Sequence, residues 1–126
     1  MTPPRTVRLL LLFEAAIFIA AALIHFGLLI DGYAHWKAGT AEGVIAVVLL
    51  GGMVMTWIRP GSARGLGLAA QAFALLGTLV GIFTIAIGVG PRTPPDIALH
   101  VGLVVVLVSG LSLASRGRLS GPAQQA

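Results

Sequence analysis

Four apolar stretches, each long enough to cross a bilayer as a helix, dominate this chain of 126 residues. They run from about 7 to 30, 41 to 58, 66 to 89 and 94 to 114. Crossing the hydrocarbon core takes about 20 helical residues. Helices are expected rather than barrel strands, because lipid forces backbone groups to pair locally and no alternating pattern is present. The sequence therefore predicts a single-domain, all-α membrane protein (1–126) with four transmembrane helices.

The composition indicates that the surface of this protein faces lipid. Hydrophobic residues make up 57% of the chain and charged residues 10%, against about 25% charged residues in a typical soluble domain. The formal charge is +4, but the basic residues are scattered between apolar stretches and form no patch. Nucleic acid is therefore excluded as a partner, and the lipid bilayer is expected instead. The chain has no cysteine, which rules out disulfides and thiolate metal sites.

The basic residues set the expected orientation, because cytoplasmic loops of membrane proteins are enriched in lysine and arginine. Four spans would leave Lys37 and Arg92 on one side, and on the other side Arg5, Arg8, Arg59, Arg64, Arg116 and Arg118. This bias places the N-terminus and the C-terminus in the cytoplasm. The outer loops are expected at about 31–40 and 90–93, the inner loop at about 59–65 and a disordered tail at about 115–126. Loops this short favour an antiparallel bundle.

The expected location is the inner (plasma) membrane of a bacterium. Abundant Ala, Gly, Val, Leu and Arg suit a GC-rich bacterium. In length and helix count the chain is similar to DoxX-like and other small four-span bacterial membrane proteins, a similarity that no motif carries and that implies no activity. Residues 1–22 alternatively resemble a cleaved signal peptide, with a basic start, an apolar stretch and three alanines. The apolar stretch continues to Ile30, which favours a retained helix.

Ionisable residues inside apolar spans are costly in lipid and are therefore candidate functional residues. Those expected to gather near the outer face are His25, His35, Glu42, Asp96 and His100. Imidazole and carboxylate groups suit a zinc, copper or iron ion. Alternatively, His25 and His100, expected at matching depth on two helices, could hold a haem iron. The sequence predicts a site for a metal ion or haem here, with no spacing that chooses between them.

These residues also have structural interpretations. Thr93 and Asp96, on either side of two prolines, match the capping box that begins a helix. Glu42 could offset the positive N-terminal end of its helix, and His35 could be an ordinary loop residue. A buried neutral histidine, such as His25 or His100, can also be satisfied by a hydroxyl or a carbonyl group.

A second polar group is expected toward the cytoplasmic side, around Glu14. The side chains at comparable depth are Gln71, Thr56, Ser109 and Ser112. A carboxyl group that faces Gln71 would fix the packing of two helices. Glu14 and His25 are 11 residues apart and share one helix face. A small proton-coupled carrier that uses Glu14 and His25 is therefore one alternative function.

Gly77 and Gly81 have the GxxxG spacing that lets membrane helices approach closely. They are expected to pack within the bundle, or else against a second protomer or a membrane-complex partner. The second use makes a non-catalytic structural or accessory subunit another alternative function. Because no phosphate-binding loop, HExxH or GxSxG motif is present, an enzyme is not favoured.

Overall fold

The structure, a computed structural model that describes residues 3–116, is all-helical. Its elements are α1 (Pro3–His25), α2 (Trp36–Ile58), the 3-10 turn η1 (Pro60–Ser62), α3 (Ala63–Ala86) and α4 (Pro94–Arg116). The four α-helices are each long and apolar enough to cross a membrane. The predicted four-span membrane character is therefore confirmed, and a lipid bilayer is the environment of this protein.

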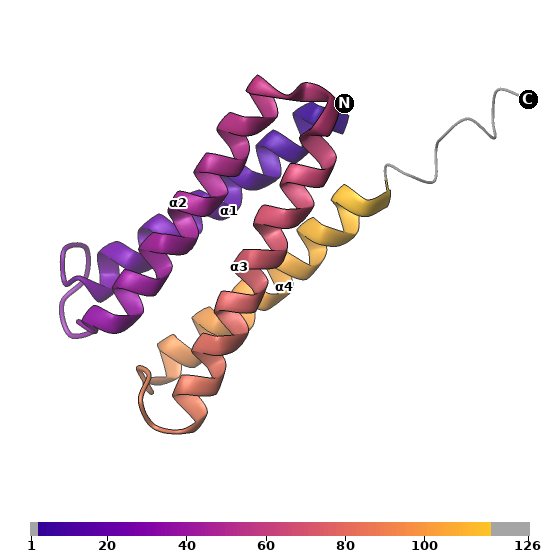
Figure 1. Cartoon of the computed structure of the whole chain (residues 1–126). Coiled ribbons are helices and arrows are strands. Elements are labelled where there is room, and N and C mark those ends of the chain that lie inside the picture. Colours follow the sequence, from indigo (N-terminus) through magenta and orange to yellow (C-terminus); the bar gives the residue numbers. More distant parts are fainter. Residues whose placement is uncertain (1–2, 117–126) are drawn as a thin grey trace, which may run out of the picture.

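The helices lie side by side, with their connections at two ends of the molecule (Figure 1). We call the end that carries the connections 26–35 and 87–93 the hairpin end. The opposite end, which carries Pro3, Arg116 and η1, is called the termini end. Helix α1 contacts all three other long helices. Any polar residue on its inner face therefore meets side chains from the rest of the bundle.

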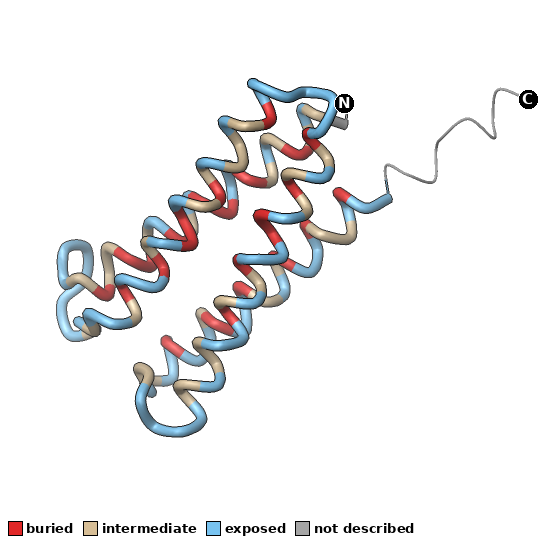
Figure 2. The backbone as a smooth tube through the Cα atoms, viewed as in Figure 1, coloured by how far each residue is buried: buried red, intermediate tan, exposed pale blue. Residues whose placement is uncertain are grey.

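Burial follows the pattern expected of a protein in lipid. Figure 2 shows buried residues where the helices face one another and exposed residues on their outer sides. The core contains Leu11, Phe18, Leu49 and Leu107, all almost completely buried. Large apolar side chains such as Val47 are exposed on the outside. Such exposure would be unfavourable in water and is favourable against lipid tails.

Helices α1 and α3 end earlier than the apolar stretches predict, at His25 and Ala86. In both, a glycine follows in the left-handed region, Gly27 with φ 74° and Gly88 with φ 86°. The amide two residues beyond the helix cap then bonds back, from Leu28 to the Leu23 carbonyl at 2.9 Å in the first case. This glycine-dependent motif ends helices regardless of the hydrophobicity that follows.

Four of the other helix boundaries also differ from the predictions, whereas α2 ends at Ile58 as predicted. Helix α1 begins at residue 3 rather than 7, α2 at 36 rather than 41, and α3 at 63 rather than 66. Helix α4 begins at Pro94 as predicted but continues to Arg116, so the predicted tail does not include residues 115 and 116. Arg64 donates to the carbonyls of Ala114 (3.1 Å) and Ser115 (2.9 Å), which stabilises this last turn. The rest of the predicted tail, with Arg118, lies outside the described residues.

Candidate functional site

The polar centre at the hairpin end is a histidine held between two carboxyl groups from different helices. His25 Nδ1 lies 2.7 Å from Glu42 Oε2, and His25 Nε2 lies 3.0 Å from Asp96 Oδ1. The three residues are 0%, 4% and 4% exposed respectively. Helices α1, α2 and α4 each contribute one residue to this cluster, and His25 is the last residue of α1, not one inside it as the sequence predicts.

The two hydrogen bonds determine how many protons are shared within the cluster formed by Glu42, His25 and Asp96. Each of its two bonds joins a ring nitrogen to a carboxylate oxygen, so each needs one proton. With no further proton on either carboxyl group, an imidazole with two shared protons contributes +1 and two carboxylates contribute −2, which gives a net charge of −1 wherever along the two bonds the protons sit. Glu42 Oε1 is buried and has no hydrogen-bond partner among the described residues. In that state the cluster has an unpaired oxygen that carries negative charge, in a region where charge is costly.

Asp96 has a second, structural role at the beginning of α4. Its Oδ2 accepts hydrogen bonds from the Thr93 amide (3.1 Å) and from the Thr93 hydroxyl. The Asp96 amide in turn donates to Thr93 Oγ1 at 3.3 Å. The predicted capping box is confirmed. The same carboxyl group also holds His25, so the structural and functional interpretations of Asp96 apply together.

His100 lies one turn after Asp96 on α4, and its tautomer follows from its partner. Nδ1 is 2.8 Å from the carbonyl oxygen of Asp96, which only accepts, so Nδ1 carries the proton. In the neutral ring Nε2 is then an acceptor, and no hydrogen bond among the described residues uses it. A Cβ on Gly81 would lie 3.0 Å from this nitrogen, so the glycine makes room for the ring.

His35 caps α2 and connects the two loops of the hairpin end. Its Nδ1 accepts from the Ala38 amide at 3.2 Å, so Nε2 carries the proton and donates to the Val89 carbonyl at 3.2 Å. Its backbone amide also donates to the His25 carbonyl at 2.7 Å. Both ring nitrogens are therefore engaged in structural bonds. Sequence reasoning missed this cap because histidine is not among the usual N-cap residues.

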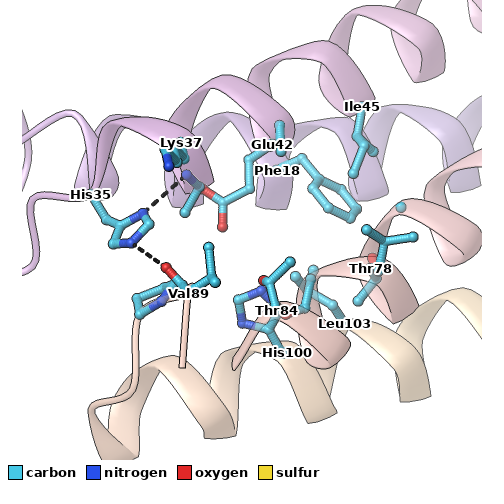
Figure 3. Close-up of a pocket in the computed structure, with 17 residues that line it drawn as sticks. Phe18, His35, Lys37, Glu42, Ile45, Thr78, Thr84, Val89, His100 and Leu103 are labelled. Carbon is cyan, nitrogen blue, oxygen red and sulfur yellow. Dashed lines mark hydrogen bonds between the residues drawn. The ribbon is translucent and has the colours of Figure 1, made fainter. Parts of the chain in front are cut away.

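A cavity of about 170 Å³ lies beside this cluster, between α2 and the α3–α4 pair. Figure 3 shows the Glu42 carboxyl group directed toward the space that His100 faces from the other side. Most of the wall is apolar, with Phe18, Ile45 and Leu103 among its members. The two unpaired acceptors, on Glu42 and His100, thus border a mainly apolar space.

Among residues 3–116, no group of three or more histidine and acidic side chains has an arrangement that could hold a metal ion. The expected five-residue metal site is therefore not shown. No protein-family model, curated protein or solved structure matches this chain.

The second predicted polar group is centred on Glu14 and Gln71. Glu14 Oε1 accepts from Gln71 Nε2 at 2.8 Å, and both residues are 1% exposed. The hydroxyl groups expected nearby lie elsewhere: Thr56 binds Arg8, and Ser109 is exposed. Because α1 begins at Pro3, Glu14 lies at the middle of the helix and not near its N-terminal end.

Three glycines make space for neighbouring side chains in the interior of the protein, and one of them borders the Glu14–Gln71 pair. A Cβ on Gly110 would lie 2.3 Å from Glu14 Oε1 and 2.6 Å from Gln71 Nε2, so the pair fits only against a residue without a side chain. Sequence reasoning missed Gly110. A Cβ on Gly77 would lie 2.7 Å from Ile45 Cδ1. Gly77 and Gly81 therefore both make close contacts within this chain.

Proposed function

We propose that this protein binds a small ligand carrying a primary ammonium group in the cavity at the hairpin end. We infer an antiparallel bundle with both termini in the cytoplasm of the inner membrane, so that the ligand enters from the outer side. The observation that carries the proposal is the pair of unpaired acceptors, Glu42 Oε1 and His100 Nε2, that border one mainly apolar cavity. An ammonium group supplies three donors, and its charge offsets the net −1 of the cluster.

The other polar groups of the cavity favour a ligand that donates hydrogen bonds. The Thr78 hydroxyl donates to the Ala74 carbonyl at 2.8 Å, and the Thr84 hydroxyl donates to the Gly81 carbonyl at 2.7 Å. These hydroxyls therefore offer only lone pairs to the cavity. Lys37 also lines the cavity, but it is an exposed residue. An acceptor-rich, weakly solvated site favours a cationic donor over an anion.

The size of the cavity limits the ligand. Its volume is about 170 Å³, and a cavity of about 150 Å³ holds a molecule such as benzene. A short alkyl or aryl ammonium ion fits this space. Its apolar body would contact Phe18, Ile45 and Leu103, and its ammonium group would lie between Glu42 and His100.

Calorimetric titration of the detergent-purified protein with n-butylammonium tests the proposal. We expect saturable binding that n-butanol and tetramethylammonium do not reproduce, because the first has no charge and the second has no N–H. Glu42→Gln should weaken binding by about tenfold or more, the equivalent of about 1.4 kcal/mol. Asp31→Asn, at an exposed acid of the hairpin end outside the cavity, should leave binding unchanged. Equal binding of n-butanol, or an unaffected Glu42→Gln variant, would overturn the proposal.

A metal ion is the second candidate, because a carboxylate oxygen and an imidazole nitrogen are both acceptable ligands. In that case Zn²⁺ or Co²⁺ would displace n-butylammonium, with loss of metal binding in His100→Ala. A haem held by His25 and His100 would require His25 to give up a carboxylate bond, and a Soret band in the purified protein would reveal it.

The two remaining alternatives make different predictions. A proton-coupled carrier would lose transport in Glu14→Gln. An accessory subunit would bind no ligand, and would lose its partner when Gly77 or Gly81 is replaced.

A further inference from the structure

The termini end has a groove of its own, unrelated to the ligand cavity. It lies between α1 and α2, has a volume of about 560 Å³ and is lined by Arg5, Arg8, Leu9, Leu12, Met53 and Trp57. The two arginines are in the first turns of α1, and Trp57 is the second-to-last residue of α2. Basic, aromatic and apolar side chains therefore meet where these two helices reach the membrane surface.

The Arg8 guanidinium is fixed in place in this groove. Its Nε donates to Thr56 Oγ1 at 3.0 Å, and its Nη2 donates to the Thr56 carbonyl at 2.8 Å. Its Cζ lies 3.8 Å from the centroid of the Trp57 ring, within the range of a cation–π contact. Arg5 is three residues earlier and so projects from the same side of α1. Both arginines line the groove, so the charge of Arg5 lies on the same side of α1 as the fixed charge of Arg8.

Among residues 3–116, no carboxylate neutralises these arginines. The four acidic residues are Glu14 in the middle of α1 and, at the hairpin end, Asp31, Glu42 and Asp96. Both ion pairs within residues 3–116 involve His25. The described part of the chain therefore supplies no counter-charge for Arg5 and Arg8, and an external anion can supply it.

We propose that this groove binds an anionic phospholipid, with the headgroup phosphate at Arg5 and Arg8 and an acyl chain along Leu9, Leu12 and Met53. Arginine matches the geometry of a phosphate. Tryptophan settles at the level of the headgroups, and anionic lipids attract basic residues at the membrane surface. The apolar part of the groove distinguishes a lipid from a free phosphate ion.

Fluorescence quenching by brominated lipids tests this proposal on the full chain. The protein has two tryptophans, and Trp36 is exposed at the hairpin end. Trp36→Phe therefore leaves Trp57 as the single reporter of the groove. In bilayers of mixed lipids, phosphatidylglycerol with brominated chains should quench Trp57 at a lower mole fraction than phosphatidylcholine with the same chains.

Variants that remove one arginine charge then show which residue causes the preference for phosphatidylglycerol over phosphatidylcholine. Arg5→Gln should reduce the preference for phosphatidylglycerol by about fivefold, the usual effect of one basic residue at a membrane surface. Arg59→Gln, an exposed arginine at the same end but outside the groove, should leave it unchanged. Equal quenching by the two lipids, or equal losses in the two variants, would overturn the proposal. Competition by inorganic phosphate at millimolar concentration would also overturn it, since it would show a simple anion site.

Discussion

Replacement of Gly110 by alanine should destabilise the bundle, because this glycine makes room for the Glu14–Gln71 pair. The added Cβ would lie 2.3 Å from Glu14 Oε1 and 2.6 Å from Gln71 Nε2, closer than non-bonded atoms approach. Both partners belong to long side chains that are 1% exposed, so they have little space to move into. The hydrogen bond of 2.8 Å between them must therefore lengthen or break.

The size of this effect follows from three contributions. Loss of a hydrogen bond between membrane helices costs about 0.6–1.7 kcal/mol. Overpacking of a filled interior costs about 1–3 kcal/mol. The better helix propensity of alanine returns about 1 kcal/mol. The net loss of unfolding free energy should be about 1–4 kcal/mol, the total of these terms.

The assay is reversible unfolding in mixed micelles titrated with SDS, followed by circular dichroism. Gly102→Ala on the same helix is the matched control, because a Cβ there meets no atom within 4 Å. It should be neutral or stabilising. In a Glu14→Ala background, Gly110→Ala should cost less by about 1 kcal/mol, as expected for residues in contact. Equal effects of Gly110→Ala and Gly102→Ala would refute this explanation of the glycine.

Three further predictions concern the hairpin end and the orientation. Thr93→Ala should cost about 1 kcal/mol of unfolding free energy through loss of the cap, and should weaken n-butylammonium binding because Asp96 is no longer held; unchanged stability in the SDS titration would contradict the capping role. His35→Ala should lower the unfolding free energy by a similar amount. His35→Asn should retain most of that free energy, because asparagine can also cap the helix, and identical unfolding curves for the two variants would count against the cap. Because the chain has no cysteine, a membrane-impermeant maleimide should label Asp31→Cys in intact cells and Gly61→Cys only after permeabilisation; the reverse pattern would place the termini outside.

The four spans were predictable because hydrophobic length and the absence of charge determine them almost alone. The helix ends were not predictable in this way, because hydropathy does not reveal where a glycine ends a helix. Leu28, Leu29 and Ile30 extend the first apolar stretch, but Gly27 has already ended α1. These three residues are exposed in the connection that follows.

The sequence indicates which residues are candidates for the site more readily than it indicates which of them form hydrogen bonds with one another. Their depth in the apolar spans groups His25, Glu42, Asp96 and His100, because lipid leaves few positions for such side chains. Their pairing depends on the rotation of each helix about its axis and on the side-chain rotamers. Neither can be inferred from a single sequence. The role of Gly110 was hidden for the same reason, since it appears only when α4 is placed against Glu14 and Gln71.

Nitrogen-15 NMR of histidine-labelled protein, titrated with n-butylammonium, tests the central claim most directly. The free protein should show His100 with its proton on Nδ1, and ligand should shift the Nε2 resonance as this nitrogen accepts a hydrogen bond. His35, whose ring nitrogens are both engaged elsewhere, should remain unchanged. A His100 Nε2 resonance that stays fixed at saturating n-butylammonium would contradict a ligand site between Glu42 and His100.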